Sequence, residues 1–425
     1  MRRLRILFLF LVIGSFSKPA LSQTENKVYK DHIQSVRLFP LGTEVYGQLD
    51  SPVVPLGGNR PLILFFDDIA YDPEQYSAKL IHCDADWEPS QLRDNDFLTV
   101  YNEFNIQDYT YSIDTRIPYI HYKFTLPKVT KSGNYVLKVY AGRDESNVML
   151  TRRFMVYENL FATGAAVVPP SETLNRRQNQ QINAVINYSK GEVMDPASQV
   201  TVVIRQNQRW DNSKILKKPT FLNQSSKIMR FESFDGENTF RAGNEFRFVD
   251  LRFIRATGVN ISSIKVDTDR IDAMANMDVP REKEPYSQYL DLNGQYLIYT
   301  NDRVSGNHEV ESEYILTTFN LSIPKTPQPV YLLGSMTGWG DDVQSEMSWN
   351  EEFSVYQTTV FLKQGWYDYQ YAFKTPEGEF DTFPFEGSHF ETENEYEVLV
   401  YFRNLGSRYD QLVGYVYLQP NRRRL

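Results

Sequence analysis

The stretch Ile120-His121-Tyr122-Lys123-Phe124-Thr125-Leu126 decides the fold class of the chain. Apolar side chains occupy every second position of this stretch, which is the pattern of a β-strand with one buried face. The alternation returns at residues 135–139, 200–204 and 367–373, and turn sequences such as Lys131-Ser132-Gly133 separate the runs. Many short strands with such turns predict β-sandwiches, and therefore an all-β fold.

Residues 181–188 form a run that could be assigned in two ways. Their composition is compatible with a helix, but Ile182, Ala184, Ile186 and Tyr188 fall on alternate positions. Because alternation of this kind is typical of half-buried strands, we expect a strand here.

The first 22 residues have the layout of a secretory signal peptide. A basic start, Arg2-Arg3-Leu4-Arg5, precedes an apolar run over 6–13, and small residues follow up to Ser22. The apolar run is shorter than the roughly 20 residues that a membrane-spanning helix needs. We therefore expect cleavage after Ser22, export from the cytoplasm, and a mature chain with no transmembrane segment.

Composition limits the partners and the chemistry of the chain. The net charge is −9, and loss of four basic residues with the signal peptide changes it to −13. An acidic chain repels phosphate backbones, so we expect no nucleic-acid partner. The single cysteine, Cys83, excludes an internal disulfide, and the stability of the exported chain must therefore come from its apolar cores.

The sequence divides into three predicted blocks after the signal peptide (1–22). We expect an N-terminal β-sandwich domain over 23–157 and a second β-rich domain over 158–323. The Pro-rich segment 324–329 predicts an extended linker, after which 330–425 would form a C-terminal domain.

The cluster at residues 81–87 combines a histidine, the only cysteine, two aspartates and a tryptophan, which invites a metal-site or nucleophile interpretation. Neighbouring side chains of a strand point to opposite faces, so His82 and Cys83 would not converge on one ion. A nucleophilic Cys83 would need a base and an oxyanion hole, and no sequence motif supplies either. We therefore favour a structural role, in which the aspartates bond turn amides and Trp87 packs across the end of a sandwich.

An acidic run over 377–397 contains eight carboxylates and no lysine or arginine. Calcium prefers such oxygens, but the loop pattern of a calcium site is absent. The glutamates at 391, 393, 395 and 397 alternate, so we expect them on a solvated strand face that resists pairing at a sheet edge.

Two tryptophan motifs stand out in the C-terminal block. Gly334-Ser335-Met336-Thr337-Gly338-Trp339 and Gly365-Trp366-Tyr367 resemble the early-set immunoglobulin-like modules related to glycogen-binding domains, with methionine where phenylalanine is usual. Exposed indole faces can stack on sugars, so Trp339 and Trp366, together with Trp349, are candidate contacts with a ligand or partner. Packing of the same rings in a core is the alternative, and it is the favoured one.

A series of ordered sequence landmarks between Tyr29 and Ile323 resembles the plug-protein family of the type IX secretion system. The landmarks run Ile33-Gln34-Ser35-Val36, Ser51-Pro52-Val53-Val54-Pro55-Leu56-Gly57, Phe65-Phe66-Asp67-Asp68, Ile81-His82-Cys83-Asp84-Ala85-Asp86-Trp87, Tyr119-Ile120-His121-Tyr122, Ser132-Gly133-Asn134-Tyr135, Gln180-Gln181-Ile182-Asn183 and Gly243-Asn244-Glu245-Phe246-Arg247. Their order over most of the mature chain is more specific than any single motif.

This resemblance implies tandem immunoglobulin-like β-sandwich domains in a periplasmic protein of Bacteroidota-type bacteria. It also implies a partner, the large outer-membrane β-barrel translocon, whose periplasmic opening the protein would close when no cargo is passing, which would limit leakage during protein secretion. The family supplies no catalytic, cofactor or metal-binding residues, so we expect a protein that is not an enzyme. We expect a structural role for the family fingerprint, which comprises His82, Asp84, Asp86, Trp87, Gly133, Asn134 and Tyr135.

Two rival functions remain open from the residues alone. An exported carbohydrate-binding β-sandwich module would use Trp339, Trp349 and Trp366. An exported hydrolase would depend on His82, Cys83, Asp84 and Asp86.

Overall fold

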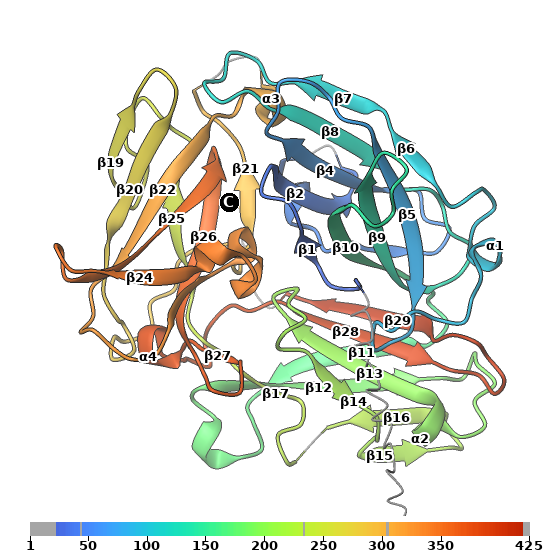
Figure 1. Cartoon of the computed structure of the whole chain (residues 1–425). Coiled ribbons are helices and arrows are strands. Elements are labelled where there is room, and N and C mark those ends of the chain that lie inside the picture. Colours follow the sequence, from blue (N-terminus) through green and yellow to red (C-terminus); the bar gives the residue numbers. More distant parts are fainter. Residues whose placement is uncertain (1–22, 43–44, 233, 303–305, 420–425) are drawn as a thin grey trace, which may run out of the picture.

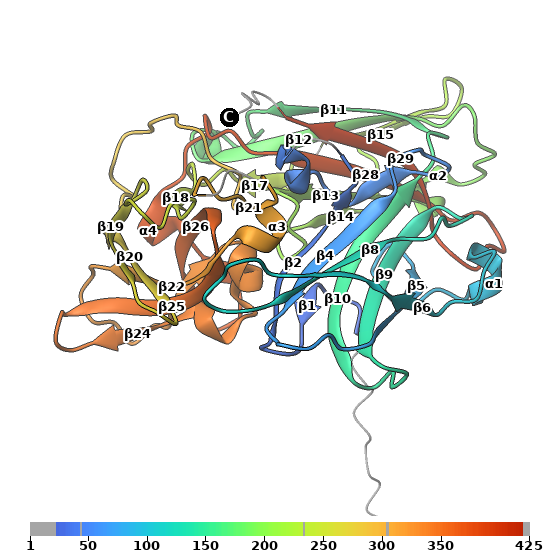
Figure 2. The ribbon, with the colours of Figure 1, turned by 90° about the horizontal axis from the view of Figure 1, so that it is seen from above.

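The computed structural model describes residues 23–42, 45–232, 234–302 and 306–419, and almost all of its regular structure is β-strand (Figure 1). The predicted signal peptide lies outside these residues. The strands form three bodies, here called the first sandwich, the second sandwich and the third body, which Figure 2 shows from above. The predicted all-β fold with several sandwiches is confirmed.

The first sandwich contains the stretch that decided the fold class. Its larger sheet has the order β1 (Lys27–Val28), β10 (Val148–Tyr157), β9 (Gly133–Ala141), β5 (Tyr76–Cys83) and β6 (Phe104–Ile106), with β3 (Val53–Pro55) parallel to β10. The facing sheet has the order β2 (Ile33–Pro40), β4 (Leu62–Asp68), β8 (Ile120–Thr125) and β7 (Asp108–Tyr111).

The core between these sheets follows from the alternation in β8. Ile120 and Tyr122 are fully buried against Phe66 and Leu137, which belong to the two facing sheets. His121, which the alternation places on the other face of β8, is also buried, because the third body covers that face.

The second sandwich is made from two distant parts of the chain. One sheet has the order β11 (Ala162–Val168), β12 (Asn179–Asn187), β16 (Ile228–Phe231) and β15 (Phe221–Asn223), with β17 (Thr239–Arg241) also on β12. The other has the order β14 (Lys214–Leu216), β13 (Val200–Gln206), β28 (Tyr396–Phe402) and β29 (Gln411–Leu418). β12 confirms the strand predicted at 181–188 up to Asn187.

The third body is a ten-stranded sheet that encloses its own apolar core. The main path runs β18 (Arg247–Asp250), β26 (Gly365–Lys374), β23 (Val330–Leu333), β24 (Glu346–Asn350), β25 (Val355–Lys363), β22 (Tyr314–Leu321), β20 (Ile271–Asp278) and β19 (Ile261–Val266). β21 (Tyr296–Ile298) and β27 (Phe380–Asp381) pair with β26. Val249 from one end of the path and Ile271 from the other belong to one buried cluster, so the sheet folds back over itself.

The strand pairing corrects the division expected from the sequence. β22 precedes the Pro-rich segment 324–329 and β25 follows it, yet the two strands pair along eight residues. β13 of the expected second domain pairs with β28 of the expected C-terminal domain. The Pro-rich segment connects β22 and β23, which belong to the same sheet, so it does not separate two domains.

The acidic run over 377–397 also differs from its predicted solvated strand face. β28 lies between β13 and β29 rather than at an edge, and Glu397 is only 1% exposed. Its carboxylate is 2.6 Å from Nε of the equally buried Arg205 on β13. A cross-strand partner far away in the sequence is what makes this glutamate compatible with burial.

The helices are short and lie at the ends of strands. They are α1 (Asp94–Phe97), α2 (Pro196–Gln199), α3 (His308–Glu311) and α4 (Phe383–Glu386). Within the residues that the structure describes, no helix has the length and apolar character needed to cross a membrane.

Candidate functional site

His82, the central residue of the fingerprint, lies on β5 with both ring nitrogens engaged. Its Nδ1 is 2.9 Å from Ser90 Oγ and its Nε2 is 3.1 Å from the carbonyl oxygen of Ser132. The ring packs edge-on against Tyr135 and Tyr409. Burial lowers the pKa of His82. The imidazole therefore holds two turns together and has no nitrogen free to act as a base.

The backbone conformation and the close contacts at position 133 explain why the fingerprint has a glycine there, packed against His82. The φ of Gly133 is +136°, and a Cβ placed there would lie 2.6 Å from His82 Nε2 and 3.2 Å from the carbonyl oxygen of Asp410. The two following residues are buried: Asn134 donates to the Asp84 carbonyl oxygen at 2.9 Å, and Tyr135 stacks within the first sandwich core.

Asp84 and Asp410 form a joint between the first and second sandwiches. Asp84 accepts from the Asp410 backbone N–H at 3.0 Å, and Asp410 accepts from the Ala85 N–H at 3.0 Å. Arg403, in the loop between β28 and β29, binds both carboxylates at 2.5 and 2.7 Å. Asn134 adds to the same joint, because its amide oxygen accepts from the Tyr401 hydroxyl at 2.7 Å.

The other fingerprint residues are local or packing groups. Asp86 is exposed and accepts from the Glu88 N–H at 3.2 Å, which is the turn role expected from the sequence. Trp87 is buried, adopts φ +69°, and packs edge-on against Trp210 of the second sandwich, with ring centroids 4.8 Å apart. Asp84, Asn134 and Trp87 of the fingerprint therefore contact the second sandwich.

Cys83 has the environment of a packed thiol rather than a nucleophile. It is fully buried in an apolar cluster with Val136 and Met155. Burial raises the pKa of the thiol to about 12, so the reactive thiolate is scarce at neutral pH. Within the described residues, no group of three His, Cys, Asp or Glu side chains is placed to hold a metal ion.

A second joint, between the first sandwich and the third body, centres on the buried carboxylate of Asp67 at the end of β4. Asp67 accepts from Lys363 Nζ at 2.5 Å and from the Tyr314 hydroxyl at 2.7 Å, both in the third body. Its other oxygen is 2.7 Å from His121 Nδ1. Lys363 also donates to the Glu309 carbonyl oxygen at 2.6 Å. Asp67 and Lys363 are both fully buried, so this charge pair is cut off from water.

No local sequence pattern indicates that Asp67 and Lys363 would meet. Asp67 and His121 were family landmarks without an assigned role, and Lys363 lies 296 positions from Asp67. A lysine at the end of an amphipathic strand is usually solvated. Only the packing of β25 against the first sandwich brings it to the carboxylate.

The Asp67 carboxylate is expected to make stability depend on pH. Burial alone would raise its pKa, but Lys363 and His121 outweigh burial and lower the pKa to about 2, against 3.8 ordinarily. The pKa of Asp67 is lower in the folded protein than in the unfolded chain. The stabilisation that the Asp67 carboxylate contributes is therefore present above about pH 4 and is lost as the pH falls towards 2. The difference in unfolding free energy between the natural protein and Asp67→Asn should therefore shrink by about 2 kcal/mol between pH 5 and pH 2. Urea unfolding at several pH values measures it, and a difference that stays constant would contradict the assignment.

Trp339 and Trp366, the candidate ligand contacts, are both half-buried and packed within the protein. Trp366 stacks on Phe248 with centroids 4.1 Å apart, and its Nε1 donates to Asp368 at 2.9 Å. The Arg209 guanidinium lies 4.2 Å above the Trp339 ring, and Phe246 packs edge-on against that ring. These contacts favour the packing role over an open stacking platform for sugar.

A cleft of about 480 Å³ opens where the three bodies meet, and Trp339 lines it. Arg152 and Arg153 of β10 line its first-sandwich side, while Arg205 and Trp210 line its second-sandwich side. Five arginines in all border this cleft of an acidic protein. Arg152 and Arg153 are adjacent in the sequence, and no local pattern groups them with Arg205 of β13.

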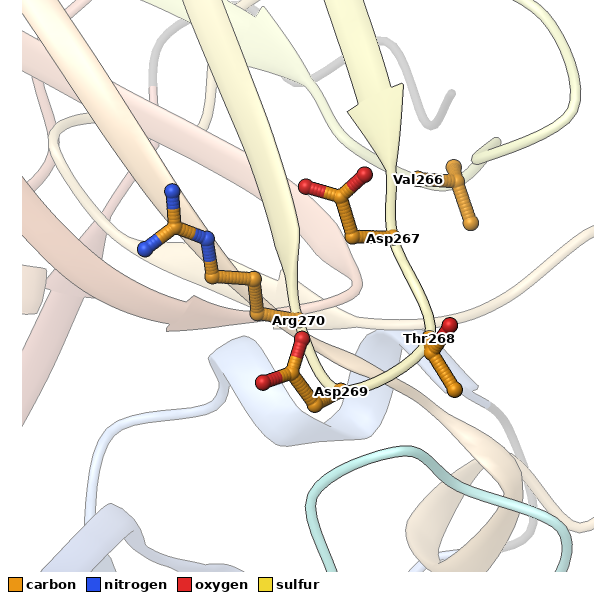
Figure 3. Close-up of a pocket in the computed structure, with 5 residues that line it drawn as sticks. All are labelled: Val266, Asp267, Thr268, Asp269 and Arg270. Atoms are coloured by element: carbon orange, nitrogen blue, oxygen red, sulfur yellow. The ribbon is translucent and has the colours of Figure 1, made fainter.

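A shallower hollow lies at the tip of the β19–β20 hairpin (Figure 3). Val266, Asp267, Thr268, Asp269 and Arg270 line it, and all five belong to one turn. Lys265 and Arg116 already bind Asp267, through its carboxylate and its carbonyl oxygen respectively. The hollow is the open side of a turn and brings together no residues from separate elements.

The structure therefore defines a class of protein. It is an all-β molecule of several sandwiches in contact with one another, and the fingerprint residues are packed within it. Residues 33–158 match the family described as type 9 secretion system plug protein 1st domain. The first sandwich therefore matches the family that the landmarks within it predicted.

The solved structures include a similar protein along nearly the whole chain. A crystal structure described as that of a hypothetical protein from Parabacteroides merdae is 26% identical, with a TM-score of 0.87. The match covers 94% of this chain and 100% of that one. The arrangement of all three bodies is therefore shared. No match was found among curated proteins.

Proposed function

We propose that this protein is a periplasmic plug, which binds the large outer-membrane β-barrel translocon of the type IX secretion system and closes its periplasmic opening. The observation that carries the proposal is the match of residues 33–158 to the plug-protein first domain. The secretory signal layout at 1–22 supports a place in the cell envelope, and the acidic net charge would favour association with basic groups around the barrel opening.

The joints between the bodies suit this mechanical role. A plug has to resist deformation when the barrel holds it, because a compliant plug would leak. The Asp67–Lys363 pair fixes the third body to the first sandwich, and the Arg403–Asp84 pair fixes the second. The buried Asp67–Lys363 pair at one joint and the buried Tyr401–Asn134 hydrogen bond at the other favour one relative orientation of the bodies. Closing an opening in this way needs no chemical step, so we propose that the protein is not an enzyme.

The two rival functions have less support. The hydrolase would need His82 and Cys83, but one has both ring nitrogens engaged and the other is a buried thiol of high pKa. The carbohydrate module would need open indole faces, but Trp339 and Trp366 contact neighbouring side chains.

Loss of the protein is expected to make the outer membrane permeable. In a strain with the gene deleted, uptake of a large antibiotic such as vancomycin should rise, and a copy of the natural gene should restore the barrier. An affinity-tagged protein, purified in mild detergent, should bring the translocon with it. Failure to recover the translocon at all would overturn the proposal.

The control for this experiment is Arg270→Gln, at the hairpin tip away from both joints. Arg270 is exposed, and its ion pair among the described residues is with the neighbouring Asp272. This variant should fold, bind and restore the barrier like the natural protein.

A further inference from the structure

The cleft between the three bodies has more positive charge than its own carboxylates can neutralise. Three of its five arginines have acidic partners: Arg37 binds Glu309, Arg205 binds Glu397, and Arg209 binds Asp211. The remaining two, Arg152 and Arg153, form no ion pair with any carboxylate in the part of the chain that the structure describes.

Arg152 and Arg153 retain most of their hydrogen-bonding capacity. Arg152 donates from one nitrogen to the Thr151 carbonyl oxygen at 2.9 Å, and Arg153 donates from Nε to the Thr24 carbonyl oxygen at 2.5 Å. A guanidinium has five N–H donors, so each group keeps several that these bonds do not use. Both side chains are half-buried, and burial lowers the pKa of each to about 10.

The acidic residues on the cleft wall are engaged or lie at its exposed margin. Asp50 binds Arg60 at 3.1 Å and Asp211 binds Arg209, while Glu25 and Asp341 are exposed. The interior of the cleft therefore presents guanidinium groups in a partly dry setting, where an anion interacts more strongly than in water.

The aromatic walls restrict the kind of ligand. Arg205 and Arg153 lie 4.5 and 5.6 Å from the Trp210 ring centre, and Arg209 lies over Trp339. Guanidinium groups therefore occupy ring faces on which a neutral sugar would stack. A volume of about 480 Å³ falls within the usual range for small-molecule sites.

We propose that this cleft binds a small organic anion with two or more carboxylate or phosphate groups, held by Arg152 and Arg153. Arg152 and Arg153 project from opposite faces of β10, so each guanidinium would bind a different anionic group of the ligand, and the group on Arg153 would lie towards Arg205. The site does not depend on the plug role. An anion there would contact all three bodies at once and would strengthen their association.

Calorimetric titration of the full mature protein at low salt tests the site, with citrate and inorganic phosphate as separate probes and glucose as the neutral control. Citrate should bind, glucose should not, and added salt should weaken citrate binding. Arg152→Gln and Arg153→Gln should each weaken citrate binding about tenfold, which corresponds to the loss of a charge-assisted hydrogen bond. Arg152→Lys keeps the charge without the planar fork and should give an intermediate affinity.

The matched control is Arg270→Gln, which removes an exposed arginine far from the cleft and should bind citrate like the natural protein. Thermal unfolding confirms that each variant is folded, and citrate should raise the midpoint of the natural protein more than that of Arg152→Gln. Equal citrate affinity in the natural protein and Arg152→Gln would overturn the proposal. So would equal responses to citrate and glucose, or tighter binding of a glutamate-rich peptide than of citrate.

Discussion

Replacement of Lys363 by methionine is expected to lower the free energy of unfolding by about 3–5 kcal/mol, the usual cost of removing one partner from a buried ion pair. Methionine has nearly the same length and fills the same space, so packing loss contributes little. The loss arises because the Asp67 carboxylate, which is fully buried, keeps only His121 and Tyr314 as partners. Urea unfolding at neutral pH measures the change.

A second substitution separates charge from packing. In the double variant Asp67→Asn with Lys363→Met, no uncompensated carboxylate remains, so stability should recover in part relative to Lys363→Met alone. Lys325→Met is the control, because Lys325 is exposed and pairs with the exposed Glu351. It should unfold like the natural protein. A double variant less stable than either single variant would contradict the role of the buried charge.

Gly133→Ala is expected to cost about 2–4 kcal/mol, because a strained backbone and an overpacked contact each add about 1–3 kcal/mol. The added Cβ would lie 2.6 Å from Nε2 of His82. That ring cannot move aside without losing its contacts with Ser90 and Ser132. The disturbance should reach the second sandwich through Asp410, and thermal unfolding should show a lower midpoint.

Gly142→Ala provides a control for the backbone contribution. Gly142 also has a positive φ, +57°, but no atom lies within 4 Å of a Cβ placed there. The substitution should cost only about 1 kcal/mol, the penalty of the left-handed conformation. If the two alanine variants have equal stability, the contact with His82 is not what makes glycine necessary at position 133.

The sequence predicted the strands better than their partners. Alternation over 120–126 and 181–188 identified β8 and β12, because the faces of a half-buried strand record burial directly. It could not predict that β13 pairs with β28, since the two strands lie almost 200 positions apart and no local signal specifies pairing. The expected division at 324–329 had the same origin: proline reports backbone conformation, not sheet membership.

The candidate site shows a similar limit. Strand geometry correctly separated His82 from Cys83, and the turn role of Asp86 follows from ordinary turn chemistry. The partners of Asp84 and Trp87 could not be predicted from the sequence, because these partners, Arg403 and Trp210, belong to other parts of the chain. Several family landmarks lie where sandwiches touch, which explains why no single one of them had an evident function.

The late position of β28 and β29 in the chain has a consequence for biogenesis. During synthesis, β13 is made long before β28, the strand that pairs with it. Until the last thirty or so residues emerge, one side of β13 lacks its partner, and such an edge invites pairing with other chains. Both sheets of the first sandwich lie within residues 27–157, so this sandwich can fold before the C-terminal strands are made. The second sandwich therefore depends on a late hairpin, β28–β29, which completes one of its sheets and brings Asp410 to the fingerprint.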